Sequence, residues 1–307
     1  MLNQIKDGNV VKIEGILSEV DLKHTTYTVN NVEKKAIGGV IKIRTNAVVN
    51  GEEKELEIPV HMFSNQFTNA GAPNPAYESI ERVMNDYISI AASDIDRADR
   101  VRITRGAIQM NEYYGQTGNL VSFPRITASF VSKIKKEECR PEASFTVTMV
   151  VGEKGYELDK DGVETETYKV KGLIPQYGGK IDVVPFYATN PGVIDAISNY
   201  WNEGETVRAA GKLNFTSKTE TKTVAVDFGE PTTTTSTITV SELIITGGNA
   251  TPLEGEFAIP YEDVAAALEE RKARLAELKV KSQQKGKAGK APAPATGSAN
   301  KFADLGF

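Results

Sequence analysis

Residues 190–215 read NPGVIDAISNYWNEGETVRAAGKLNF, and the order of elements in this stretch decides the fold. Its Asn-Pro start predicts a short helix, because asparagine caps helices and proline fits the first helical turn. Gly204 predicts a turn, and the alternating residues 206–215 predict a strand. The same order occurs over residues 74–110, where another Asn-Pro pair opens a helical segment that leads into a strand. A helix placed before the fourth strand, present twice, indicates two copies of one small β-barrel.

The segments around the first helix complete a predicted barrel. Residues 10–20 form a β-rich run with Gly15 in its interior, where glycine favours the bend of a strand that curls around a barrel. Residues 23–36 are polar and predict a connection, and Asn50-Gly51 predicts a hairpin. The predicted strands are residues 10–20, 38–45, 55–63, 100–110 and 123–134. Three strands, a helix and two strands are the order of an OB-fold, a five-stranded Greek-key barrel.

A second barrel is predicted on the same plan. Its strands are expected at residues 145–151, 164–174, 179–187, 206–215 and 235–246. The alignment pairs IPVHMF at 58–63 with IDVVPF at 181–186, and ITAS at 126–129 with ITVS at 238–241. It places Phe63 and Phe186 in the two cores, and Trp201 beside the second helix is expected in the core as well. Two unrelated β domains are the alternative to a duplication.

The chain divides into four predicted segments. These are a first OB-fold-like domain at 1–140, a second at 141–250, a C-terminal helix at 251–281, and a disordered linker and tail at 282–307. Val264, Leu268, Leu275 and Leu278 form an apolar stripe on the helix, which is consistent with a cap on the second barrel and with self-association into a homo-oligomer. The expected fold class is mainly β: two tandem OB-fold-like five-stranded barrels, each with a helix before its fourth strand.

Composition limits the class of protein. The 307 residues are 40% hydrophobic and 25% charged, which is typical of a globular protein. No apolar run approaches the ~20 residues that span a bilayer, so we expect no membrane partner. The single cysteine, Cys139, excludes an internal disulfide and favours a reducing compartment. We therefore expect a cytoplasmic location.

Formal charge is distributed unevenly along the chain. Residues 1–140 hold 18 Lys/Arg against 18 Asp/Glu, residues 141–249 hold 9 against 15, and residues 250–307 hold 9 against 8. The three parts carry 0, −6 and +1 of the total of −5. A nucleic-acid site must therefore be a local groove, and the first unit can best supply it.

The sequence lacks the common signatures of catalysis. His24 and His61 have no second Cys or His nearby, which argues against zinc. Neither a GxxxxGK[ST] phosphate loop nor a GxSxG nucleophile elbow occurs. Asp159, Asp161 and Gly162 match a hairpin turn better than a calcium loop. We therefore expect no enzymatic activity, no metal and no cofactor.

Basic and aromatic residues interleave where an OB-fold binds single strands, on its second and third strands and at its first and last loops. In the first unit the candidates are Lys42, Arg44, Arg102, Arg105, Tyr113, Tyr114, Phe123 and Arg125. Their counterparts in the second unit are Tyr177, Tyr187, Arg208, Lys212 and Phe215. The alternative is that the cations form a solvated strand face and that the tyrosines pack on the barrel rim.

This arrangement resembles phage-type single-stranded DNA-binding proteins with tandem OB-folds, over residues 10–246 in architecture and over the C-terminal tail in layout. The tail of such proteins ends in a short acidic, hydrophobic peptide whose terminal aromatic residue recruits replication and repair proteins. Asp304, Leu305 and Phe307 match that pattern in part. A single acidic residue and Gly306, where proline is commoner, depart from it.

The resemblance implies sequence-tolerant binding and protection of single-stranded DNA during replication or recombination, without catalysis. An alternative is a structural or assembly protein, such as a virion or tail component whose β domains bind other proteins. The acidic second unit and the Thr-rich residues 232–239 favour that alternative. An RNA-binding module is a third possibility.

Overall fold

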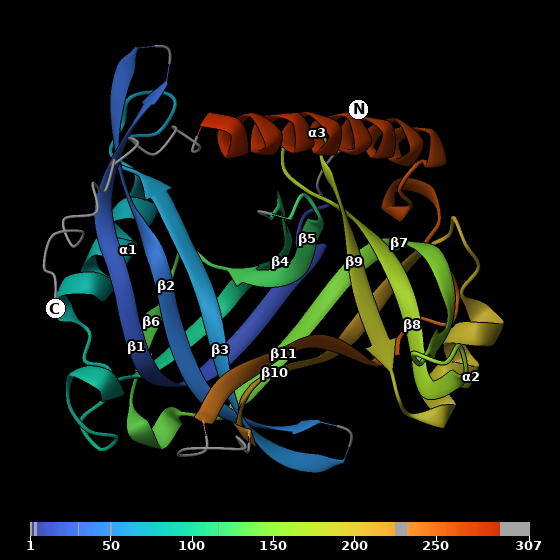
Figure 1. Cartoon of the computed structure of the whole chain (residues 1–307), viewed down its shortest axis with the longest axis horizontal. Coiled ribbons are helices and arrows are strands. Elements are labelled where there is room, and N and C mark those ends of the chain that lie inside the picture. The colour runs from blue at the N-terminus through green and yellow to red at the C-terminus, as the bar shows by residue number, and fades with distance from the viewer. Residues whose placement is uncertain are drawn as a thin grey trace, which may run out of the picture.

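Two β-barrels lie side by side beneath one long helix in the computed structural model of the protein (Figure 1). The structure describes residues 2, 5–29, 31–49, 51–115, 117–224 and 232–288. For residues 217–224, 232–239 and 285–288 it describes the backbone alone. The first barrel contains β1 (Asn9–Val29), β2 (Val32–Val49), β3 (Glu52–Asn65), α1 (Pro75–Asp86), β4 (Arg100–Tyr114), β5 (Leu120–Thr127) and β6 (Ser132–Ile134). The second contains β7 (Glu142–Leu158), β8 (Glu164–Pro175), β9 (Ile181–Ala188), α2 (Pro191–Tyr200), β10 (Thr206–Val224) and β11 (Thr232–Gly248). The helix above them is α3 (Tyr261–Ala288), and short 3-10 turns lie at Ile90–Ala92, Lys136–Glu138 and Gly255–Phe257.

The first barrel closes in the order β1-β2-β3-β5-β4-β1, with β3 and β5 parallel and the other pairs antiparallel. Because α1 lies between β3 and β4, this is the predicted OB-fold order. Asn74 caps α1 by accepting the Ala76 N–H at 3.1 Å. Gly15 lies where β1 passes from β4 to β2, and a Cβ there would stand 2.3 Å from the Arg44 carbonyl oxygen. The predicted bend at Gly15 is therefore confirmed, and only glycine fits it.

The second barrel closes in the same order, β7-β8-β9-β11-β10-β7, with α2 between β9 and β10. The predicted alignment between the two barrels is nevertheless wrong in register. Phe186 is fully buried, whereas Phe63 is 57% exposed and its neighbour Met62 faces the core. A shift of one residue moves every side chain of a strand to the opposite face. The alignment of residues 126–129 with 238–241 is wrong too. Ile126 pairs with β3 in the first barrel, and the residue that pairs in the same way with β9 in the second barrel is Ile244, not Ile238.

Two predicted irregular segments are regular in the structure. Residues 23–36, predicted as a polar connection, belong to β1 and β2, which form a long ribbon that turns at Asn31 with φ 62°. Its β-branched and aromatic residues suit strands even where both faces are exposed. Helix α3 continues to Ala288, past the predicted start of the linker at residue 282, since Gln, Lys and Ala favour helix. Asp304, Leu305 and Phe307 lie outside the described residues.

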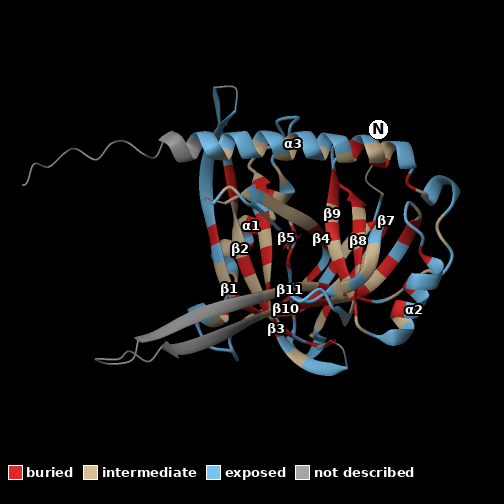
Figure 2. Ribbon diagram, turned by 45° about the vertical axis from the view of Figure 1, so that its right-hand side comes forward, coloured by how far each residue is buried: buried red, intermediate tan, exposed pale blue. Residues whose placement is uncertain are grey.

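The two barrels share one eleven-stranded sheet. The first half of β1, Asn9–Glu14, pairs antiparallel with Glu142–Val147 of β7. One hydrophobic cluster contains core residues of both barrels, such as Ile13 and Phe145. Figure 2 shows the buried residues gathered on the strands of both barrels.

Helix α3 crosses from the second barrel to the first. Its first turns bury Val264 and Ala267 against Val150 and Ile181 of the second barrel. Farther along, Arg271 and Arg274 bind the carboxylate of Glu112 on β4, the latter at 3.0 Å. The helix thus covers the second barrel, as one prediction had it, and also binds the first. None of the described helices combines the length and the apolar composition needed to cross a bilayer.

The contact between α3 and the first barrel is buried at Glu112, whose side chain is 1% exposed. We predict that Glu112→Gln lowers the free energy of unfolding by about 3 kcal/mol, because it leaves two arginines without a counter-charge. Urea unfolding measures the change. The control is Glu269→Gln, which removes an exposed ion pair of α3 and should change stability by less than about 0.5 kcal/mol. Equal losses in both variants would contradict the assignment.

Asp182 on β9 joins the barrels near the same crossing by accepting the Met110 N–H at 2.9 Å. Burial raises the pKa of Asp182 above its ordinary value of 3.8. A carboxyl with a raised pKa binds its proton more tightly in the folded protein, so its contribution to stability is full at low pH and is lost as the pH rises through the folded pKa. We predict that Asp182→Asn, which keeps an acceptor but removes the charge, raises Tm at pH 7. The gain should shrink towards pH 4, and a lower Tm at pH 7 would refute the prediction.

Candidate nucleic-acid interface

An aromatic row crosses the outer face of the first barrel. Alternation along β3 turns Phe63 and His61 outward, and β5 and β4 add Arg125, Phe123 and Tyr113. His61 pairs with β5 in parallel register, so β3 and β5 form one surface. Tyr113 and Phe123, 46% and 38% exposed, meet edge to face with ring centroids 6.4 Å apart. The row thus presents three partly free rings with a guanidinium and an imidazole between them.

The row continues onto β1 at Tyr27. The Tyr27 and Phe63 ring centroids lie 6.3 Å apart, and the Tyr27 hydroxyl donates to Asn65 Oδ1 at 2.6 Å. The Phe63 ring lies over Gly38 of β2, where a Cβ would come within 3.0 Å of its Cδ2 atom. Burial, and then the nearby Arg125, lower the pKa of His61, which keeps the imidazole neutral at pH 7.

Three of the predicted cations are paired with carboxylates. Lys42 Nζ lies 2.5 Å from Glu19, Arg44 Nε lies 3.7 Å from Glu55, and Arg102 Nε lies 2.6 Å from Glu14. The hydrogen bond to Glu19 raises the pKa of Lys42. A cation on one strand faces an acid on the next, which stabilises a sheet and neutralises the charge locally. These residues are therefore weaker phosphate ligands than their sequence pattern indicates.

The other first-barrel candidates differ in accessibility. Arg105 on β4 is exposed and forms no ion pair within the described part of the chain. Arg125 is half-buried, reaches Gln109 at 3.4 Å and keeps a buried Nε without a partner among the described residues. Tyr114 alternates away from Tyr113 and is half-buried.

The second barrel carries a smaller version of this face. Lys169 Nζ lies 5.7 Å from the centroid of the Tyr187 ring, on the outer side of β8 and β9. Tyr177 is 83% exposed in the turn between these strands. Arg208 is exposed on β10, and Lys212 lines a cleft where β7 and β10 meet β1.

Phe215 is wrong as a binding residue, because it alternates inward with Leu213 and is 2% exposed in the second core. Trp201 is 3% exposed and donates its indole N–H to the Asn249 carbonyl at 2.7 Å, which confirms its predicted core position. The second barrel therefore offers two tyrosines, and Phe215 contributes to its folding instead.

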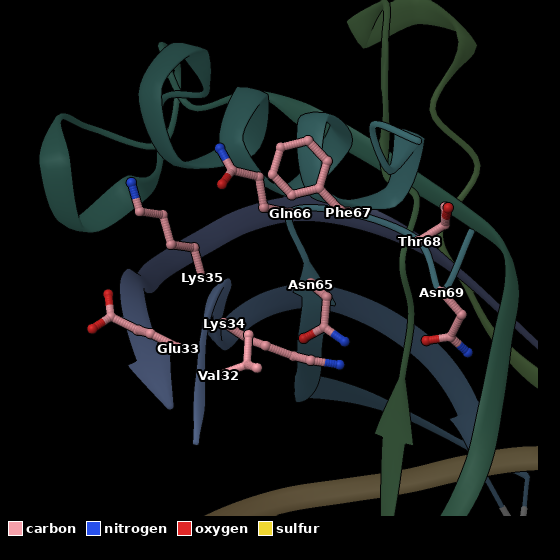
Figure 3. Close-up of a pocket in the computed structure, with 9 residues that line it drawn as sticks. All are labelled: Val32, Glu33, Lys34, Lys35, Asn65, Gln66, Phe67, Thr68 and Asn69. Carbon is pink, nitrogen blue, oxygen red and sulfur yellow. The ribbon is translucent and has the colours of Figure 1, made fainter. Parts of the chain in front are cut away.

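Several exposed residues beside the row escaped sequence reasoning. A cleft of about 520 Å³ lies between the β1–β2 ribbon and the loop after β3 (Figure 3). It is lined by Val32, Glu33, Lys34, Lys35, Asn65, Gln66, Phe67, Thr68 and Asn69. Recognition of residues 23–36 as a strand pair would have placed Lys34 and Lys35 beside β3. Among the described residues, no three His, Cys, Asp or Glu side chains gather into a metal site.

Arg102 serves the fold. Glu14, with a 6% exposed side chain, accepts from Arg102 and from the backbone N–H of Arg140. The bond to Arg102 is the main cause that lowers the pKa of Glu14 below 4.5, so its stabilising contribution is present above that pH and is lost as the pH falls through the lowered pKa.

We predict that Arg102→Gln lowers the midpoint of urea unfolding at pH 7, because it leaves the carboxylate of Glu14 without its cation. The stability of this variant should also fall less steeply below pH 4.5. Urea unfolding at pH 7 and at pH 3.5 measures both effects. Arg105→Gln is the matched control on the same strand, and a similar loss in this variant would argue against the role of Glu14.

Two solved structures of the single-stranded DNA binding protein from Thermus aquaticus are similar to the chain. The wild-type structure is 9% identical with a TM-score of 0.47 and covers 80% of this chain and 94% of its own. A deletion mutant is 11% identical with a TM-score of 0.47 and covers 80% and 95%. At this level of likeness, the fold assignment depends on the strand order described above. The search of the curated proteins found no match. A family model does match over residues 7–281, and the chain belongs to that family, YorF.

Proposed function

We propose that the protein binds single-stranded DNA, without strong preference for sequence, on the outer face of its first barrel. The observation that carries the proposal is the aromatic row of Tyr27, Phe63, Phe123 and Tyr113 with Arg125 among its rings. Exposed rings stack on any base, and each stack contributes about 1–3 kcal/mol. In a duplex both faces of each base are already stacked, so such a row selects unpaired strands.

Local charge supports the proposal in spite of the net charge of −5. Lys34 and Lys35 at one end of the row form no ion pair with any described residue, and they are exposed. Arg105 provides a further exposed cation on β4. A few phosphate contacts give a moderate salt dependence, smaller than that of a strongly basic protein.

The proposed role is to coat and protect single-stranded DNA during replication or recombination. The resemblance to phage-type single-stranded DNA-binding proteins supports it. On the same basis Asp304, Leu305 and Phe307 are proposed to recruit partner proteins.

A second candidate is an assembly protein, and exposed apolar residues at the hairpin tips favour it. Leu158 and Val163, in and after β7, are 59% and 60% exposed, and Val48 at the β2–β3 hairpin is 58% exposed. Apolar side chains in such positions fit contacts with other proteins. Size-exclusion chromatography with light scattering, with and without oligonucleotide, separates the candidates: discrete oligomers that ignore the oligonucleotide favour assembly.

We predict that Phe63→Ala and Phe123→Ala each weaken binding of a labelled oligo-dT by about 1–3 kcal/mol, which is roughly 5- to 150-fold in Kd. Fluorescence anisotropy at two salt concentrations measures Kd, which should also rise with salt. Phe257→Ala removes a ring that is 62% exposed in the 3-10 turn before α3, and it should leave Kd unchanged. Wild-type affinity no tighter for oligo-dT than for a duplex would refute the proposed function.

A further inference from the structure

We propose that the cleft between the β1–β2 ribbon and the loop after β3 binds one unstacked nucleotide, at one end of the bound strand. This inference rests on the proposed function and adds to it a separate site with its own chemistry. At about 520 Å³, the cleft falls in the range of roughly 300–1,000 Å³ that is usual for small-molecule sites.

The aromatic part of the site is Phe67. Its side chain is 54% exposed, and Figure 3 shows its ring at one side of the cleft with Lys34, Asn65 and Val32 across from it. Val32 is 59% exposed and adds an apolar surface on the ribbon. A ring on one side and an isopropyl group on the other suit the two faces of a base.

Backbone hydrogen bonds hold the loop that presents Phe67. The Gln66 N–H donates to the Lys35 carbonyl at 2.9 Å, which ties the loop to the ribbon. The Thr68 N–H donates to the Ala72 carbonyl at 2.8 Å, and Phe67 forms a β-bridge with Pro73. The cleft is therefore shaped before any ligand enters, so binding costs little ordering of the protein.

The polar lining suits the edge of a base and a phosphate. Asn65 Oδ1 is occupied by the Tyr27 hydroxyl, which leaves the amide N–H groups of Asn65 to donate to a base carbonyl. Lys34 and Lys35 form no ion pair among the described residues, and either can bind a phosphate. Against these two lysines the lining holds one carboxylate, that of Glu33, so its formal charge is positive, which suits a phosphate-bearing ligand.

The cleft is continuous with the aromatic row. Phe63 and Asn65 share one face of β3, because side chains two residues apart along a strand point the same way. Tyr27 contacts Phe63 and binds Asn65, so it belongs to both sites. A strand that stacks on Phe123 and Phe63 thus leads into the cleft, where its terminal nucleotide is bound.

Photo-crosslinking tests the inference. A labelled oligo-dT with one 5-iodouracil, placed at the 5′ end, in the middle or at the 3′ end, is irradiated with the full chain, and the crosslinked residue is identified by mass spectrometry. We expect Phe67 to crosslink to one end only, and Tyr113 or Phe123 to crosslink to the middle base. Phe67→Ala should abolish the end crosslink, leave the middle crosslink, and raise Kd about 5-fold or more.

A second variant keeps the test independent of the ring. Lys34→Gln with Lys35→Gln should reduce the slope of log K against log salt by about 0.7 to 1.4, since each phosphate that a lysine no longer neutralises lowers the slope by roughly 0.7. Phe257→Ala, in the exposed turn before α3, and Lys160→Gln, in the exposed turn between β7 and β8, are the controls and should change neither result.

The outcomes separate this inference from the proposed function. Tight oligonucleotide binding with crosslinks at Phe123 but none at Phe67, or an end crosslink unaffected by Phe67→Ala, overturns the cleft and leaves the function intact. Absence of oligo-dT binding by the wild-type chain overturns both.

Discussion

The structure depends on the antiparallel pairing between the first halves of β1 and β7. One edge of Asn9–Glu14 pairs with β4 and so closes the first barrel, while its other edge pairs with β7. Glu142–Val147 does the same for the second barrel through β10. Each strand leaves this pairing to continue along its own barrel, β1 to β2 and β7 to β8. Since backbone groups are paired on both edges, neither barrel keeps an open edge at the junction.

The pairing brings two carboxylates together, and the surrounding contacts follow from that. Glu14 lies directly opposite Glu142, and like charges at opposed positions destabilise a sheet. Arg102 and the backbone N–H of Arg140 bind Glu14, while the Ser144 hydroxyl donates to Glu142 at 2.6 Å. Arg102, which the alternation of its strand predicted to face a phosphate, is instead needed by the fold because it binds Glu14. Residues 135–141, which connect the two barrels, are correspondingly tied to β1 through the backbone N–H of Arg140.

Local sequence signals predicted the order of elements well and the register poorly. The Asn-Pro helices and Gly15 are recognisable because capping and close backbone approach act within a few residues. The position of Phe63 was wrong because a period of two fits either face of a strand until its partner is known. Lys42, Arg44 and Arg102 meet their acids across strands, so no local pattern shows that they are paired. The polar ribbon was missed since neither of its faces is covered by a core, and alternation of hydrophobicity is then weak.

The two barrels have the same strand order but different surfaces. A fold fixes the positions of its strands, and the residues at those positions decide what the surface can bind. On β3 the outward residue near the strand end is Phe63, whereas the corresponding end of β9 presents Tyr187 beside Lys169. Lys169 also lies 3.9 Å from Glu157, so its charge is partly neutralised. Helix α3 binds both barrels, which holds their outer faces in a fixed relation whatever each face binds. The second, more acidic barrel therefore stands at a constant position relative to the aromatic row of the first barrel.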